Sequence, residues 1–285
     1  MANQAAEPMA RGIETPSGKR ARDENFPVGS ILIARRLRPH VMRYYAFARA
    51  ADDIADNPGL APDEKLRRLD AFEAGLAAGA TAPEAAVRLR DSLAETGVAD
   101  RHARDLLVAF RQDAAKLRYA DWRELMEYCA VSAHPVGRYL LDLHGEAAAT
   151  HGPGDALCAA LQVLNHLQDC GADRRDLDRV YLPADWMAEA GTGVAALDAP
   201  AASPGLRRVI DRCLDGCDAL LERAAPLAGI VRARRLAAEV AVIQRLARRL
   251  AARLRREDPL ARRVKHSRRD LLAGLAAGLG RLVRP

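Results

Sequence analysis

The chain has 285 residues, of which 49% are hydrophobic, 29% charged and 4% aromatic, with a formal net charge of +6. This composition excludes a disordered or collagen-like chain, and no run of 18 apolar residues predicts a membrane span. The five cysteines form no CxxC pair, which argues against a disulfide framework or a zinc site and favours a reducing cytoplasm.

The first 23 residues contain no apolar stretch of the length that a secretory signal requires. We expect a disordered tail there, followed by one domain over residues 24–285. Further along the chain, apolar residues recur at three- and four-residue spacing, which predicts an all-α protein. In chain order, the predicted helices span residues 38–55, 62–77, 84–95, 101–116, 121–143, 154–173, 206–225, 231–256 and 268–282. The longest interior stretch without this periodicity, 174–204, is of the kind that often forms a functional lid.

A first polar row lies at the end of the predicted helix 38–55. It consists of Tyr45, Arg49, Asp52, Asp53 and Asp56. At about 100° per residue, these side chains occupy roughly 100° of the helix face. Like charges four residues apart destabilise a helix by roughly 0.2–0.5 kcal/mol, so a cation is expected beside them. A solvent-exposed acidic face is the alternative explanation.

A second polar row lies in the predicted helix 154–173. It consists of Gln162, Asn165, Asp169 and Asp173, which share roughly 80° of the helix face. Their neighbours are apolar, so this helix should be largely buried and its polar row should face a cavity or a partner. Two oxygen-lined rows across a helical bundle suit Mg²⁺, which binds one or two carboxylates together with waters and substrate phosphates. The sequence therefore indicates a phosphate ester or diphosphate as substrate.

Four ordered segments add to the two rows: residues 44–56, 128–137, 160–169 and 179–183. In residue types and spacing they resemble the squalene/phytoene synthase family, from about residue 24 to the C-terminal helix. The resemblance implies a single-domain isoprenoid-synthase helical bundle around a central cavity, with two aspartate-rich motifs on facing helices.

Within that family, the segments 24–28, 133–137 and 256–264 are most similar to the hydroxysqualene synthase branch of bacterial hopanoid biosynthesis. The resemblance implies Mg²⁺-dependent conversion of presqualene diphosphate and water to hydroxysqualene and diphosphate, without NADPH. Head-to-head condensation of two farnesyl diphosphates to presqualene diphosphate or squalene is the alternative reaction. A non-catalytic assembly factor on the same fold is an alternative of another class, although such relatives tend to lose the motif aspartates that this chain keeps.

The resemblance also implies site residues. The implied metal ligands are Asp52, Asp56, Asn165, Asp169 and Asp173. The implied catalytic residues are Asp52, Asp53, Asp56, Asp169, Asp173 and Tyr128. The implied substrate-binding residues are Phe26, Tyr45, Arg49, Ser132, Val136, Gly137, Gln162, Asn165, Arg179 and Tyr181. Among them, the aromatic rings of Phe26, Tyr45 and Tyr128 would stabilise a carbocation through their faces.

Some of these residues allow a second interpretation. Arg49 would contact diphosphate oxygens by resemblance, but it could pair with Asp53 on its own helix instead. The amides of Gln162 and Asn165 could be satisfied by the backbone of a buried helix. A tyrosine that some relatives place in the penultimate helix is absent, because residues 240–243 are aliphatic.

The predicted helix 121–143 should be kinked by Pro135, which lacks a backbone donor. Near the kink, Gly137 leaves room for a prenyl chain or allows close helix packing. His134 could place a water for carbocation capture, or it could be an ordinary core residue.

The end of the chain is basic. Residues 232–285 hold sixteen Lys and Arg against four Asp and Glu. The basic run 262–269 precedes apolar residues at helical spacing, namely Leu271, Leu272, Leu275, Leu279 and Leu282. This pattern is typical of a helix that lies on an anionic membrane, and we expect such a contact at the inner membrane face; a helix packed on the bundle is the alternative. Apart from this basic end, no pattern in the sequence indicates binding to nucleic acid.

Overall fold

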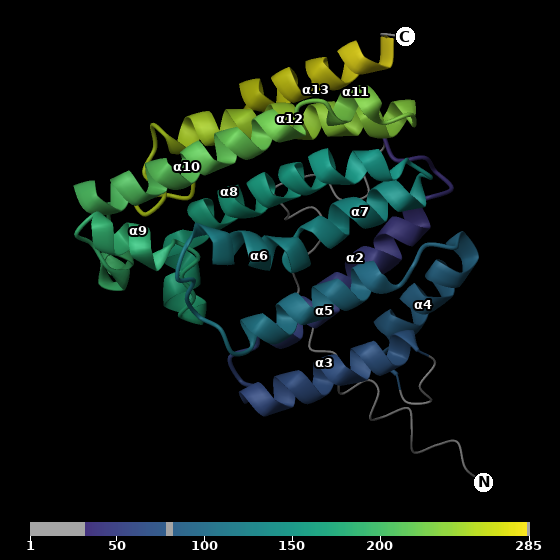
Figure 1. The fold of residues 1–285 in the computed structure, drawn as a ribbon, viewed down its shortest axis with the longest axis horizontal. Helices are drawn as coiled ribbons and strands as arrows, with labels where there is room; N and C mark the ends of the chain where they lie inside the picture. The colour runs from purple at the N-terminus through teal and green to yellow at the C-terminus, as the bar shows by residue number, and fades with distance from the viewer. Residues whose placement is uncertain (1–31, 78–81, 284–285) are drawn as a thin grey trace. The chain divides into compact units, whose positions relative to one another are not determined.

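The structure, a computed structural model, describes residues 32–77 and 82–283, and the predicted all-α fold is confirmed there (Figure 1). The described residues contain no β-strand, and one isolated bridge joins Arg118 to Val180. The helices are α2 (Arg38–Ala55), α3 (Pro62–Leu76), α4 (Glu84–Thr96), α5 (Arg101–Asp113), α6 (Trp122–Ser132), α7 (His134–Leu143), α8 (His151–Leu177), α9 (Ala184–Glu189), α10 (Pro204–Ala224), α11 (Leu227–Ile230), α12 (Arg234–Leu254) and α13 (Arg268–Val283). No helix among the described residues is long and apolar enough to cross a membrane.

Several sequence expectations differ from the structure in detail. The stretch 174–204 is not wholly irregular, because α8 continues to Leu177 and the short helix α9 follows. The predicted helix 231–256 begins only at Arg234, after α11. The predicted tail, residues 1–23, lies outside the described residues, and one domain over 24–285 stays a prediction.

The chain divides into two compact units, Met1–Lys116 and Leu117–Pro285. In the first unit, α2, α3, α4 and α5 pack together. Pro62 begins α3, where its missing N–H is not needed, and Asp63 and Glu64 place negative charge in the first turn. In the core, Phe47 of α2 and Phe72 of α3 meet edge to face with ring centroids 5.5 Å apart. Apolar packing of this kind holds α2 in place without using its polar row, so that the row can bind a ligand.

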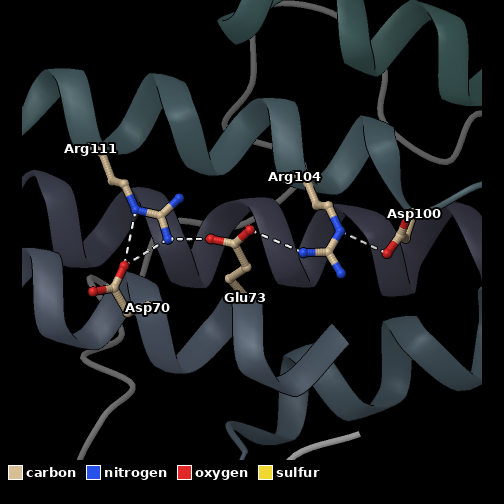
Figure 2. Close-up of polar contacts among 5 residues, drawn as sticks. All are labelled: Asp70, Glu73, Asp100, Arg104 and Arg111. Carbon is tan, nitrogen blue, oxygen red and sulfur yellow. Dashed lines mark hydrogen bonds and ion pairs between the residues drawn. The ribbon is translucent and has the colours of Figure 1, made fainter. Parts of the chain in front are cut away.

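An ion-pair network ties α3 to α5 on the outside of the first unit, as Figure 2 shows. Arg111 donates to Asp70 Oδ1 at 2.7 Å and to Glu73 Oε2 at 2.6 Å. Arg104 donates to the other oxygen of Glu73 at 3.0 Å and to Asp100 at 2.8 Å. Each partly exposed pair is worth about 0.2–1 kcal/mol, so the network contributes modestly to stability.

The second unit is built around α8. Helices α6, α7, α10 and α12 contact α8, and α13 lies along α12 on the side away from α8 (Figure 1). The apolar neighbours of the second polar row are buried as predicted: Val163, Leu164 and Leu167 are at most 1% exposed. This burial makes α8 the core element of the unit.

The predicted kink near Pro135 is a complete break between α6 and α7. Ala133 joins the two helices with φ −118° and ψ −45°, and Pro135 lies in the first turn of α7. In α7, Gly137 packs directly against α8: a Cβ at this position would lie 2.5 Å from Cys158 Sγ. Close helix packing therefore requires glycine here.

The contact between Gly137 and Cys158 predicts that Gly137→Ala destabilises the wild-type protein but not a variant that lacks the Cys158 sulfur. In the wild-type background, Gly137→Ala should lower the free energy of unfolding by about 1–3 kcal/mol, because the added methyl overpacks the α7–α8 contact. In a Cys158→Ala background the clash is absent, so the same change should be neutral or stabilising by up to about 1 kcal/mol, the helix-propensity gain of alanine over glycine. Urea unfolding of the wild type, the two single variants and the double variant measures both effects, and equal effects in the two backgrounds would contradict the contact.

Candidate active site

The first polar row lies at the C-terminal end of α2, in the first unit. Asp52 is half-buried, Asp53 is buried, and Asp56 caps the helix. Helix α2 has no basic residue in its last turn, and carboxylates there face the negative end of the helix dipole at about 0.3–1 kcal/mol each. The row is thus electrostatically unfavourable unless a cation lies against it.

Arg49 supplies one such cation. Its guanidinium approaches Asp52 Oδ2 at 2.9 Å and Asp53 Oδ1 at 2.5 Å. The ion pair with Asp53, the alternative considered for Arg49, is therefore formed, and contact with diphosphate stays a prediction. Tyr45, one turn earlier on α2, is half-buried.

The second polar row is the half-buried side of α8, in the second unit. Gln162, Asn165, Asp169 and Asp173 are all partly exposed, whereas the opposite side of the helix, with Val163, Leu164 and Leu167, is buried. The exposed faces of the row are oxygen-rich, as a cation site requires.

Asp169 is held by a residue that the sequence analysis treated only as part of a basic run. Arg263, in the segment between α12 and α13, forms a two-point pair with Asp169, Nε to Oδ1 at 2.7 Å and Nη2 to Oδ2 at 2.7 Å. The adjacent residues also pair, since Gln168 Nε2 donates to the carbonyl of Val264 at 2.5 Å. Two consecutive contacts thus fasten this segment to α8, across 94 residues of sequence.

The segment after α8 is aligned by backbone pairing with the residues that precede α6. Asp178 ends α8 with φ +51°, and its carboxylate pairs with Arg118 at 2.6 Å and also with Arg174. The hydrogen bond from Arg118 is the main cause that lowers the pKa of Asp178. Beyond this turn, the N–H of Val180 donates to the carbonyl of Leu117 at 2.9 Å.

This alignment brings four rings together in the second unit. Tyr119 stacks on Tyr181 with centroids 5.5 Å apart, and Tyr128 lies 5.3 Å from Tyr119 and 5.6 Å from Tyr181. His166 of α8 stacks on Tyr181 at 3.5 Å. We call these four residues the aromatic cluster. Tyr128 and Tyr181 were predicted site residues, whereas Tyr119 and His166 were missed, although His166 lies inside the motif 160–169.

His166 is uncharged at neutral pH. Burial, with the nearby Arg179 charge adding to it, lowers the pKa of His166 to about 3. Its Nε2 is buried and has no hydrogen-bond partner among the residues that the structure describes. Arg179 is itself buried at 6% exposure.

The remaining predicted residues lie around the break between α6 and α7. Ser132 ends α6, and Val136 is 40% exposed on α7. His134 is half-buried, with Nδ1 3.8 Å from Asp155 Oδ2. Phe26 lies outside the described residues.

The two polar rows belong to different units, and their meeting around one ligand stays a prediction. Each row fits a cation, since Asp52 and Asp169 each bind a guanidinium in this structure. Among the described residues, no group of three or more Asp, Glu, His or Cys side chains is gathered as it would be around a metal ion.

Comparison with known proteins places these features in a family. Residues 19–270 match the model of squalene/phytoene synthases. The chain is 49% identical to a hydroxysqualene synthase of Rhodopseudomonas palustris, over 90% of this chain and 88% of that protein, and 44% identical to one of Zymomonas mobilis, over 93% and 91%. The structure of squalene synthase HpnC from Alicyclobacillus acidocaldarius is similar with a TM-score of 0.74 and 32% identity, over 88% of this chain and 93% of that one. The chain therefore belongs to the squalene/phytoene synthase family.

Proposed function

We propose that this protein converts presqualene diphosphate and water to hydroxysqualene and diphosphate, with Mg²⁺ as its cofactor and without NADPH. The observation that carries the proposal is the 49% identity to a hydroxysqualene synthase over most of both chains. The acidic residues of both rows are present in this sequence, which favours catalysis over a non-catalytic assembly role.

Asp52, Asp56, Asn165, Asp169 and Asp173 would hold the metal. When bound there, Mg²⁺ neutralises the charge that develops on the departing diphosphate. The protein's own part is to bind and orient. Arg49 and Arg263 pair with Asp52 and Asp169, and their planar donor forks suit phosphate oxygens once these carboxylates hold the metal.

The hydrocarbon cation left by diphosphate departure needs a dry, electron-rich wall. The aromatic cluster suits this task because cation–π attraction contributes about 0.5–2 kcal/mol per ring. Three of its rings, those of Tyr119, Tyr128 and Tyr181, are buried. Buried rings exclude bulk water and so limit random capture of the cation.

Condensation of two farnesyl diphosphates is the second candidate reaction, because the similar Alicyclobacillus structure is described as a squalene synthase. Incubation of the purified protein with Mg²⁺ and either presqualene diphosphate or farnesyl diphosphate, with and without NADPH, separates the two. Hydroxysqualene formed from presqualene diphosphate in the absence of NADPH supports the first reaction. Presqualene diphosphate or squalene formed from farnesyl diphosphate, without hydrolysis of added presqualene diphosphate, supports the second.

Contact with an anionic membrane surface also belongs to this proposal. Helix α13 packs on α12 through its glycines, and a Cβ at Gly278 would lie 2.7 Å from a methyl of Val242. Its large apolar side chains point outward with exposed fractions of 48–79%: Leu271, Leu272, Leu275, Leu279 and Val283. Exposed Lys265, Arg268 and Arg269 lie at or just before the start of this helix. An apolar stripe beside basic side chains matches the acyl boundary and headgroups of an anionic bilayer.

Asp52→Asn and Asp169→Asn should each lower kcat at least about a hundredfold, the scale on which loss of one transition-state-stabilising group acts. Asn is nearly the same size, so the fold should persist in circular dichroism. Asp176→Asn, an exposed site on α8, is the matched control and should retain near-wild-type turnover. Near-wild-type rates for the first two variants would rule out the metal assignment.

A Leu272→Gln/Leu275→Gln/Leu279→Gln variant should bind vesicles of mixed anionic and zwitterionic lipid at least about tenfold more weakly than wild type, since three apolar anchors are lost. Co-sedimentation measures this binding, and Val108→Gln, at an exposed apolar site on α5, serves as the control. Failure of the wild-type protein to sediment with anionic vesicles would contradict the membrane contact. If the wild type forms a dimer and the leucine variant does not, the leucines bind a second copy of the chain and not a lipid surface.

A further inference from the structure

Under the proposed function, one water must reach the carbocation while all others stay away. This places two demands on a residue near the cation: an acceptor atom for a single water, and a rigid position among apolar or aromatic groups. In the second unit, His166 meets both.

The His166 ring packs against two tyrosine rings. It lies 13° from parallel to the Tyr181 ring at a centroid distance of 3.5 Å, and 6.2 Å from the Tyr128 ring. Its backbone belongs to α8, the core helix of the unit. The direction of its ring nitrogens is thus set by packing and not by a flexible loop.

The Nε2 atom of this ring is the candidate acceptor for the water. It is buried and makes no hydrogen bond to any residue that the structure describes. A buried polar atom left in this state costs about 1–3 kcal/mol, and such atoms are normally satisfied by protein or by an ordered water. An imidazole ring can accept a hydrogen bond from water through its unprotonated nitrogen.

We propose that His166 Nε2 holds the water that captures the carbocation, an inference that rests on the proposed function. Breaking the carbon–oxygen bond of presqualene diphosphate leaves its electron pair on the diphosphate. An oxygen lone pair of the held water then forms the new carbon–oxygen bond. The proton lost from that oxygen goes to a diphosphate oxygen, and the imidazole takes up no proton. His166 is a positioning residue in this step.

His134, the histidine that the sequence had suggested for this role, is placed differently. Its Nδ1 lies 3.8 Å from Asp155, whose carboxylate also binds Arg138 at 2.6 and 2.8 Å. The aromatic cluster does not include it. His134 therefore serves as the matched control.

The test compares His166→Phe, which keeps a ring to stack on Tyr181 but removes the acceptor, with His166→Gln, which keeps an acceptor. Each is given presqualene diphosphate and Mg²⁺, and both lipid products and released diphosphate are quantified. For His166→Phe, the ratio of hydroxysqualene to hydrocarbon products should fall at least about tenfold, while diphosphate release stays within about threefold of wild type. His166→Gln should restore part of the ratio, and His134→Phe should leave it unchanged.

An unchanged product ratio in His166→Phe would overturn the inference. Equal loss of diphosphate release and hydroxysqualene would also overturn it, because that result marks a structural role. A crystal structure of the wild-type protein gives a second measurement that needs no variant to fold: a water within about 3.2 Å of Nε2 is expected, and a direct protein partner there would reject the inference. Should wild-type protein form no hydroxysqualene from presqualene diphosphate, the proposed function fails, whatever this atom binds.

Discussion

Negative charge at the unfavourable end of a helix is the constraint on which this molecule depends. The last turn of α2 carries aspartates where the helix dipole already opposes them, and Arg49 lies against two of them. Arg263 likewise places a positive charge beside Asp169 of α8. Both rows are therefore cation-binding surfaces in the protein by itself. The proposed metal would exchange one kind of positive charge for another and would not need to create a site from exposed side chains.

Helical periodicity lets α8 pack in the core of the second unit and also present a polar row on one side. Its buried sides pack against α6, α7, α10 and α12, while one side keeps the polar row. Packing on several sides gives the row and His166 a rigid support, which a site built on a loop would lack. The stacked contact between His166 and Tyr181 extends this rigidity to the segment after α8.

Helix α13 reverses the usual arrangement of a surface helix. Ordinary amphipathic helices turn their large apolar side chains inward, whereas α13 packs its small residues, Gly274 and Gly278, on α12 and leaves its leucines outside. Glycine allows the two helices to approach closely, so the contact is maintained without the leucines. The proposed membrane contact through these leucines would keep the enzyme where its proposed substrate and product, both lipids, are concentrated.

The sequence by itself determined the all-α class, the approximate helices, both polar rows, an irregularity near Pro135 and the family, because each depends on local periodicity or on residues close together in the chain. Tertiary structure decided the rest. The pair between Asp169 and Arg263 joins residues 94 positions apart, and the stack of Tyr119 on Tyr181 depends on backbone pairing between two separate segments. Periodicity also could not show which face of α13 is buried, since its leucines and its glycines both recur at helical spacing. Only the packing of Gly278 against Val242 settles that choice. Contacts between distant segments depend on the path of the whole chain, and no local pattern records that path.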